Sequence, residues 1–402
     1  MLIRNSIPNL HIFVKKNQME WHRKITDKIG LYSKNFRAVA IMGVRQSGKT
    51  TVCKTIFSGY KYHNFENLNT QQYATDEPQD FLNNNTNGVV LDEVQRVPHL
   101  FNYLQEVLDN TTERGKYVLT GSSNFLLNEK ITQSLAGRVA YIEMYPLSYH
   151  EIQNAGEFGI WQHVFNGGFP EVWVNNIDPS LFYSSYIQTV IERDIRQLVN
   201  ISNINLFQNF VSFLATLVGQ EINFSKIALE IGIDSKTVQA WTGYLKVAGL
   251  IYLLPPYYSN FGKRVVKRSK LYFVDTGIVC SLLKINEVAQ LENHPLRGSI
   301  LENYCILNLV KENSFSTKKA NFYFWRSLNG VEIDLIVEND NQHVLIEIKS
   351  GSNFHSKWFK NIELFKNYSN LQPKQIILYT GNETITYGDN KQMLPYFKMN
   401  EV

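Results

Sequence analysis

The feature that most constrains this chain is a glycine-rich loop between an apolar run and a helical pattern. The apolar run covers residues 38–42, and the loop after it satisfies G-x-x-x-x-G-K-[ST] with Gly43, Val44, Arg45, Gln46, Ser47, Gly48, Lys49 and Thr50. Strand, glycine loop and helix in this order form the context of a phosphate-binding P-loop. Glycines let backbone N–H groups surround a phosphate, and the helix directs its positive end to the same place. The loop therefore predicts a nucleoside triphosphate site.

Three residues at the end of the loop have distinct expected roles. Lys49 would reach the β- and γ-phosphates of ATP, and the hydroxyl of Thr50 would bind Mg²⁺. Thr51 would complete the nucleotide-binding residues. ATP and Mg²⁺ are therefore the expected cofactors. The alternative, a plain turn between a strand and a helix, is disfavoured because the flanking pattern also fits a P-loop.

A second apolar run ends in two carboxylates, as the partner motif of a P-loop does. Residues 88–91 precede Asp92 and Glu93. Asp92 would hold Mg²⁺ through water, and Glu93 would position or deprotonate the attacking water. The alternative is an ordinary strand end with two solvated acids.

Two further positions are candidates for reading the γ-phosphate. A strand at 116–120 ends in Gly-Ser-Ser-Asn, where Asn124 or Ser123 would sense the γ-phosphate, unless these residues only cap a helix. Arg138 precedes a strand at 139–144 and would act as an arginine finger on a neighbouring subunit, unless it pairs locally. A finger would require a homo-oligomer.

Pattern and composition divide the chain into three predicted domains. Alternating strands and helices give residues 1–170 an α/β fold, a P-loop NTPase domain with a parallel sheet. In the helical region 171–275, helices at 225–232 and 235–248 precede a strand at 250–254, the order of a winged helix. The basic run at 263–270 would lie on or beside the wing and contact DNA phosphates. The alternative is a winged helix that serves as a lid or an interaction module.

The third domain, 276–402, carries charges in the pattern of a metal-dependent nuclease. Glu302 lies on a predicted helix at 296–310, Asp334 on a strand at 331–338, and Glu347 and Lys349 on a strand at 343–349. The acids would hold Mg²⁺ and the lysine would orient or activate water. Alternation places Glu347 and Lys349 on one strand face, where charged residues of a hairpin are also common. Since the three acids repel one another, we expect a raised pKa for at least one of them without metal.

Composition limits the classes that remain. Hydrophobic residues make up 44% and charged residues 19% of 402, as in soluble globular proteins, and the net charge of +4 neither requires nor opposes a nucleic-acid partner. Cys53, Cys280 and Cys305 show no metal-ligand spacing, so we expect buried free thiols in a reducing cytoplasm. No apolar run approaches the length of a membrane span, and no membrane partner is expected.

Taken together, these motifs resemble a known family. The motifs are GVRQSGKTT, VVLDEVQ, LTGSSN, LAGR, IERDI, YFVDTG and GVEIDLI…IEIKS. They lie at the positions where one family has its own motifs. This family consists of bacterial and archaeal ATPases of the AAA class that carry a C-terminal domain of unassigned function. The resemblance covers nearly the whole chain. It implies an ATPase core, a winged helix and a nuclease fold of the PD-(D/E)xK, restriction-endonuclease-like type, but no substrate. No second sensor arginine can be assigned.

Two functions stay open at this point. In the first, the protein is an ATP-driven DNA-processing enzyme whose winged helix binds DNA and whose last domain cuts it. In the second, it is a nucleotide-controlled binding or signalling module whose nuclease-like domain only grips a partner. Metal-dependent cleavage would distinguish them.

Overall fold

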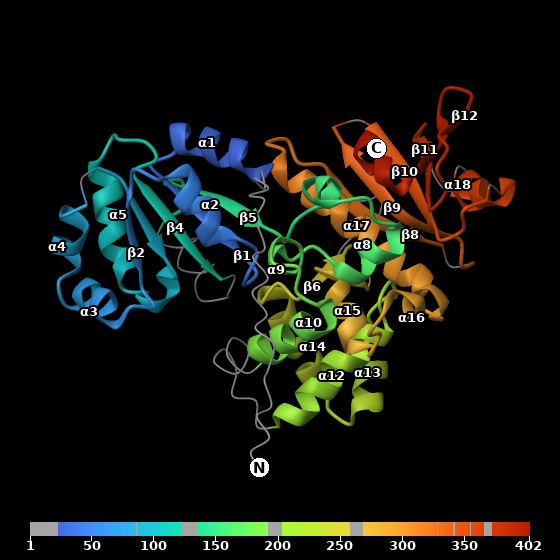
Figure 1. Ribbon diagram of the computed structural model, residues 1–402, viewed down its shortest axis with the longest axis horizontal. Helices are drawn as coiled ribbons and strands as arrows, with labels where there is room; N and C mark the ends of the chain where they lie inside the picture. The colour runs from blue at the N-terminus through green and yellow to red at the C-terminus, as the bar shows by residue number, and fades with distance from the viewer. Residues whose placement is uncertain are drawn as a thin grey trace, which may run out of the picture.

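Three parts of the chain lie against one another in the computed structural model (Figure 1). The structure describes residues 23–85, 87–122, 135–191, 203–257, 268–327, 329–340, 342–353, 355–365 and 372–402. Ser123, Asn124 and most of the basic run, residues 263–267, lie outside this set. The predicted roles of these residues therefore stay predictions.

A five-stranded parallel sheet forms the centre of the first part, which confirms the predicted α/β fold. Its order is β2-β3-β4-β1-β5. The strands are β1 (Ala38–Gly43), β2 (Lys61–Asn64), β3 (Val89–Asp92), β4 (Tyr117–Ser122) and β5 (Val139–Met144). The sheet is covered on both faces, so β1 is buried along its whole length.

Helices cover the two faces of this sheet in separate groups. One face packs against α1 (Ile25–Asn35) and α2 (Lys49–Ile56). The other face packs against α3 (Leu68–Asp76), α4 (Pro78–Asn83) and α5 (Leu100–Asn110), with the short helix η1 (Val94–Arg96) after β3. The carboxyl ends of the parallel strands stay open for a ligand, as in other open α/β sheets.

The middle part is mainly helical. Its elements are α7 (Tyr149–Ile152), η2 (Gln153–Ala155), α8 (Ile160–Asn166), α9 (Pro170–Val174), α10 (Pro179–Thr189), α12 (Ile204–Thr216), α13 (Phe224–Ile231), α14 (Ser235–Val247), β6 (Ile251–Leu254), β7 (Lys270–Phe273), α15 (Thr276–Leu282) and α16 (Val288–Asn293). Gly232, in the left-handed conformation, ends α13, and the Asp234 side chain accepts from the Thr237 N–H to cap α14. Strands β6 and β7 pair antiparallel. Helix, turn, helix and strand stand in the predicted order, and the winged-helix interpretation stays a prediction.

The basic run needs one correction. We expected Lys270 on or beside the wing surface, whereas its side chain is buried in β7. Only Arg268, at the start of the described part of the run, is exposed. Lys270 is buried because the end of the run forms the strand β7, which pairs with β6 on one side and with the backbone of Glu221 on the other.

A six-stranded mixed sheet forms the C-terminal part, with the order β12-β13-β11-β10-β9-β8. Its strands are β8 (Asn321–Arg326), β9 (Glu332–Asn339), β10 (Gln342–Lys349), β11 (Lys374–Tyr379), β12 (Ile385–Tyr387) and β13 (Lys391–Pro395). The long helix α17 (Arg297–Phe315) packs on one face, and η5 (Ser356–Phe359) and α18 (Lys360–Phe365) pack on the other. The chain ends in η6 (Tyr396–Glu401). The predicted helix at 296–310 is thus one turn longer.

Two expectations from composition can be compared with this structure. Cys53, Cys280 and Cys305 are buried and free, as expected. Within the described ranges, no helix is long and apolar enough to span a bilayer.

Candidate active site

The P-loop runs from the carboxyl end of β1 into the first turn of α2. Gly48 and Gln46 have left-handed backbone conformations, with φ of +93° and +57°, that turn the loop. A Cβ on Gly43 would lie 2.0 Å from the carbonyl oxygen of Met144 on β5, so the close approach of the two strands requires glycine. The loop therefore has the strand, turn and helix context that the motif requires.

Lys49 lies buried at the mouth of the loop. Its ammonium donates to the carbonyl oxygens of Gly43 (3.0 Å) and Val44 (2.8 Å). Burial lowers the pKa of Lys49 to about 8, although Glu93 and Asp92 act in the opposite direction. A phosphate in place of these carbonyls would give the ammonium a charged partner and a stronger hydrogen bond.

Asp92 ends β3 and is almost fully buried, which excludes the solvated strand end as an explanation. The Thr50 hydroxyl donates to Oδ2 of Asp92 (3.0 Å), and the Tyr62 hydroxyl contacts the same oxygen. The Thr120 hydroxyl contacts Oδ1 from β4. Hydroxyl and carboxylate oxygens are the ligands that Mg²⁺ prefers, so Thr50 and Asp92 fit the expected ion.

Glu93 follows Asp92 in a conformation that is costly for any residue but glycine. Its φ is +56°. The Gln95 amide contacts the Glu93 carboxylate and also donates to the Ser122 hydroxyl (3.1 Å) at the end of β4. The strained backbone and this bridge together fix the direction of the Glu93 side chain at the edge of the sheet.

A cavity of about 740 Å³ lies in front of the loop. One side is formed by Glu93 and by six P-loop residues: Arg45, Gln46, Gly48, Lys49, Thr50 and Thr51. Helices α9 and α10 and the segment between them form the other, with Pro170, Glu171, Ile177, Leu181, Phe182, Ser185, Tyr186, Thr189 and Val190. A polar end that suits phosphates and an apolar end that suits a base are typical of a nucleotide site.

Several residues of this site were not predicted from the sequence. Arg23 donates to the Ser47 carbonyl (2.6 Å) inside the P-loop and forms a buried ion pair with Glu151 (2.9 Å). No local motif marks this arginine. Thr120 offered a signal, because it is a polar residue at the end of an apolar strand. Tyr62 and the lining of α10 become part of the site only through tertiary packing.

The predicted arginine finger lies on the surface at the start of β5. The Arg138 guanidinium donates to both carboxylate oxygens of Asp109 (2.5 and 2.9 Å) and to the Ala136 carbonyl (3.1 Å). Arg138 lowers the pKa of Asp109 through this hydrogen bonding. Within one chain, Arg138 therefore pairs locally with Asp109, which was the alternative to a finger role. A finger role needs a neighbouring subunit and stays a prediction.

The four predicted nuclease residues lie in one region. Glu302, Asp334 and the pair of Glu347 with Lys349 each have different hydrogen-bond partners there. Oε1 of Glu302 accepts hydrogen bonds from the Lys270 ammonium (2.9 Å) and from the Tyr272 hydroxyl (2.5 Å). On β10, Lys349 contacts the Glu347 carboxylate, as expected for two residues on one strand face. Glu347 is almost fully buried, so this is not the ordinary solvent face of a hairpin.

Asp334 lies between these two contacts. Its Oδ2 accepts from the backbone N–H of Ile348 (2.8 Å). Burial raises the pKa of Glu302 to about 7 and that of Glu347 to about 8, and Asp334 is the second cause in both. A raised pKa is the direction we expected, but desolvation is its larger cause.

The donor set of this region does not fit a bound metal ion. Among the residues that the structure describes, no group of three His, Cys, Asp or Glu side chains could hold one. The ammonium groups of Lys270 and Lys349 already take carboxylate oxygens. Oε1 of Glu347, in contrast, is buried without a hydrogen-bond partner in the described part of the chain. The nuclease site stays a prediction from sequence.

Comparisons with known protein families match three stretches of the chain. Residues 35–153 match a family model described as an AAA domain. The chain contains an AAA-type P-loop domain. Residues 157–289 and 297–399 match two models described as domains of unknown function, DUF8612 and DUF4143. The AAA domain implies nucleotide binding, whereas the other two matches assign no activity.

Similar chains occur in bacteria and archaea. An uncharacterized protein of Mycobacterium tuberculosis is 28% identical over 318 residues, which cover 78% of this chain and 70% of that protein. An uncharacterized protein of Methanocaldococcus jannaschii is 26% identical over 345 residues, which cover 76% of this chain and 73% of that protein. Both relatives leave the function open.

Two solved structures show a distant likeness to this chain. The Walker-type ATPase of Pyrococcus abyssi has 14% identity and a TM-score of 0.44, covering 65% of this chain and 95% of its own. RuvB of Thermotoga maritima has 12% identity and a TM-score of 0.30, covering 57% of this chain and 89% of its own. The chemistry must therefore be argued from the site itself.

Proposed function

We propose that this protein hydrolyses ATP with Mg²⁺ at the P-loop of its AAA domain. One observation carries the proposal. The Thr50 hydroxyl lies 3.0 Å from a buried Asp92 oxygen, while Glu93 is held at the same sheet edge by Gln95. An oxygen pair for the metal and a directed carboxylate for water are the two parts that hydrolysis needs besides the loop.

Different residues of the chain would have different roles in the hydrolysis of ATP. Mg²⁺, when bound, would neutralise charge that develops on the phosphates, with Thr50 and Asp92 as its protein ligands. Lys49 would leave the carbonyls of the loop and contact the phosphates. Glu93 would position a water and accept its proton. Helices α9 and α10, across the cavity, would enclose the rest of the nucleotide.

Phosphate release from ATP tests this proposal. We expect Mg²⁺-dependent release by the wild type and none above background from Lys49→Ala, since Lys49 supplies the buried ammonium that would contact the phosphates. Lys34→Ala is the matched control, because Lys34 is an exposed lysine of the same domain on α1. Equal release by wild type and Lys49→Ala would refute hydrolysis at this site.

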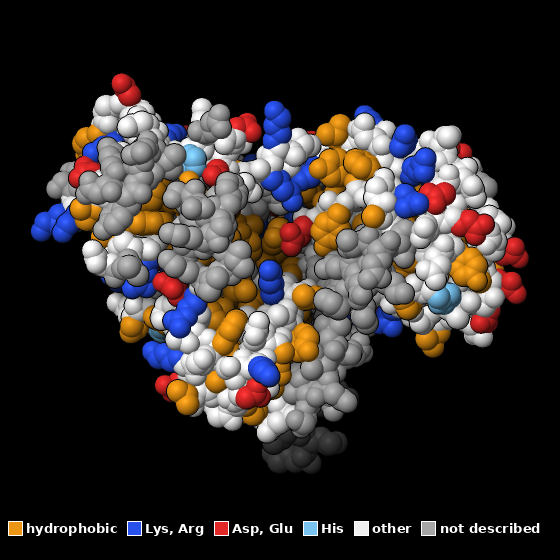
Figure 2. Space-filling view, turned by 180° about the vertical axis from the view of Figure 1, so that it is seen from behind, with side chains coloured by type: hydrophobic (Ala, Val, Ile, Leu, Met, Phe, Trp, Pro, Cys, Tyr) orange, Lys and Arg blue, Asp and Glu red, His pale blue; other side chains and the backbone are white. Residues whose placement is uncertain are grey.

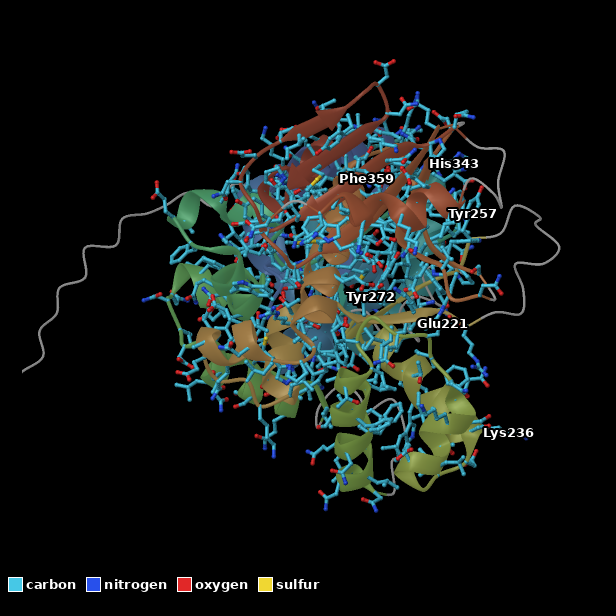
Figure 3. All side chains as sticks on the ribbon, turned by 90° about the vertical axis from the view of Figure 1, so that its right-hand side faces the viewer. Glu221, Lys236, Tyr257, Tyr272, His343 and Phe359 are labelled. Carbon is cyan, nitrogen blue, oxygen red and sulfur yellow. The ribbon has the colours of Figure 1, made fainter. Side chains whose placement is uncertain are left out.

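We further propose that the nucleotide controls contact of the middle part with DNA. The P-loop packs on that part directly, since a Cβ on Gly249, after α14, would lie 2.4 Å from Cγ1 of Val44. Helix α14 follows α13 through a tight turn and exposes Lys236 and Lys246. Lys236 lies on the outer side of α14, away from the rest of the molecule (Figure 3). A helix in this arrangement can enter a major groove.

The charge distribution sets the expected strength of such contact. Figure 2 shows Lys and Arg side chains dispersed among acidic ones on the rear face. We therefore expect weak, salt-dependent binding of duplex DNA. Fluorescence anisotropy should show weaker binding after Lys236→Ala with Lys246→Ala, with ATP changing the affinity. Unchanged affinity in that double variant would place DNA elsewhere or exclude it, and a protein partner would then be the alternative.

A further inference from the structure

Lys270 is a buried lysine held in place by its backbone. It lies opposite Leu254 of β6 in the antiparallel pair, and its other side forms a β-bridge with Glu221. Its side chain is only 2% exposed. Because backbone pairing holds it on both sides, Lys270 has little freedom to move away from what its ammonium contacts.

That ammonium reaches into the acidic region of the C-terminal part. It lies 2.9 Å from Oε1 of Glu302 on α17 and also contacts the Glu332 carboxylate on β9. The neighbouring Tyr272 hydroxyl donates to the same Glu302 oxygen. A single buried positive charge is therefore shared by two carboxylates from different elements, as a bound cation would be.

The other acids of the region also have partners inside the protein, although the buried Oε1 of Glu347 accepts no hydrogen bond from the described residues. Lys349 contacts Glu347, and the backbone N–H of Ile348 donates to Asp334. The Arg326 guanidinium lies 3.6 Å from Glu332 and 3.5 Å from Glu221. Buried carboxylates with internal cations have little need of a metal ion to offset their charge.

We propose that the Lys270 ammonium is the resident cation of this acidic cluster, in the place of the metal ion that the nuclease-like pattern implies. The C-terminal part would then not cut DNA with Mg²⁺. Its acids would instead fasten it to the middle part, because Lys270 and Tyr272 come from β7 while Glu302 and Glu332 come from the C-terminal part. Figure 3 shows Tyr272 inside the molecule, and Glu221 where the middle helices meet the C-terminal part.

The two possible roles of Glu302 predict opposite effects of its neutralisation. If Glu302 pairs with a buried lysine, Glu302→Gln removes one of the two carboxylates that contact that charge, leaves Glu332 alone to offset it, and destabilises the protein. If Glu302 belongs to an empty metal site, the same change relieves repulsion among acids and stabilises the metal-free protein. The sign of the change therefore separates a lysine-filled cluster from a metal site.

The experiment measures thermal unfolding of the full chain in EDTA and in Mn²⁺. All proteins carry Asp92→Asn, so that the P-loop site does not take the ion and the result does not depend on ATP hydrolysis. Glu302→Gln is compared with Glu338→Gln, a carboxylate of β9 outside the cluster that contacts His343 at 3.2 Å. We expect Glu302→Gln to lower the midpoint in EDTA by several degrees, and Glu338→Gln to leave it near the parent's.

Mn²⁺ provides the second readout. We expect it to leave the parent's midpoint unchanged, and we expect no Mn²⁺-dependent DNA cleavage by the wild type above a Lys349→Ala control. A higher midpoint of Glu302→Gln in EDTA would overturn the proposal. So would a rise of the parent's midpoint with Mn²⁺ that is lost in Glu302→Gln. If the Glu302→Gln chain does not fold, the parent's response to Mn²⁺ decides alone.

Discussion

At the scale of single residues, the two buried charges of the nucleotide site, Lys49 and Asp92, are held by polar groups of the protein. Asp92 is held by hydroxyls from α2, β2 and β4, and Lys49 is turned onto carbonyls of its own loop. Neither charge is solvated, so both are available to a ligand that brings compensating charge. ATP with Mg²⁺ brings a negative phosphate for Lys49 and a positive ion for Asp92.

The state of Lys49 predicts how ATP affinity depends on pH. Without nucleotide, burial holds the pKa of Lys49 at about 8, below its ordinary 10.5. Bound phosphates favour the ammonium and raise this pKa, so binding takes up a proton in the window that begins near pH 8. We expect the Kd of a fluorescent ATP analogue to be constant below about pH 7 and to rise above about pH 8. A Kd that stays constant or falls across that window would contradict this account of Lys49.

At the scale of elements, one buried carboxylate joins the helices that enclose the nucleotide. Asp275, the cap of α15, accepts hydrogen bonds from the Gly168 N–H (2.7 Å), the Tyr183 hydroxyl (2.7 Å) and the Gly277 N–H (3.0 Å). The Lys311 ammonium on α17 lies 3.9 Å away. The turn before α9, the helix α10 and the C-terminal part therefore meet at this residue.

Loss of the Asp275 carboxylate should destabilise the chain strongly. Asp275→Ala removes the acceptor of the buried Gly168 and Gly277 N–H groups and one partner each of the Tyr183 hydroxyl and Lys311, so we expect a loss of about 3–5 kcal/mol of unfolding free energy. Urea denaturation measures it. Asp178→Ala is the control, since Asp178 caps α10 at the surface and its loss should cost only about 1 kcal/mol. Equal costs for the two variants would show that Asp275 does not hold these elements together.

Elements with a local signal could be predicted from the sequence. Contacts that arise only when distant strands pair could not. The P-loop and the strand that ends in Asp92 follow from apolar runs, glycines and acids close together in the chain, and the structure has these elements where we expected them. Thr120 and Tyr62 reach Asp92 only because β2, β3 and β4 are neighbours in the sheet. The order of strands in a sheet depends on residues that are far apart in the chain, so local patterns in one sequence do not predict it.

The same limit explains the correction at Lys270. A lysine at the end of a basic run is most often a surface residue, because burial of an unpaired charge is costly. Here the cost is offset by Glu302 and Glu332, which are far away in sequence and come close through packing of α17 and β9. Spacing alone predicted acids in this region but not the cation between them.

At the scale of the whole molecule, α17 ties the AAA domain to the C-terminal part. The Lys28 ammonium of α1 donates to the carbonyls of Ser314 and Ser316, both at 2.7 Å. The Glu312 carboxylate accepts from the Ser148 hydroxyl (2.7 Å) and from Lys24 (3.2 Å). With Lys270 and Asp275, these contacts fasten all three parts together, so we expect nucleotide to act through small movements of α9, α10 and α14.

An assembly would be needed for the remaining candidate, Arg138. Its pairing with Asp109 is at the surface, where ion pairs contribute little, so Arg138 could leave Asp109 for a neighbour's nucleotide. We expect specific ATPase activity to rise with protein concentration. Arg138→Ala mixed with Lys49→Ala should regain activity, because each supplies the group that the other lacks. Activity independent of concentration, with no gain on mixing, would leave Arg138 as a surface residue.

In the proposed mechanism, Glu93 acts on water while Lys49, Thr50 and Asp92 bind the nucleotide and its ion. Glu93→Gln separates the two, since the amide can keep its contact with Gln95 but cannot accept a proton. The decisive measurement is the fate of radiolabelled ATP bound to this variant with Mg²⁺. We predict that Glu93→Gln retains intact ATP with near wild-type affinity while hydrolysis falls at least about 100-fold. Hydrolysis at the wild-type rate by Glu93→Gln would contradict the account.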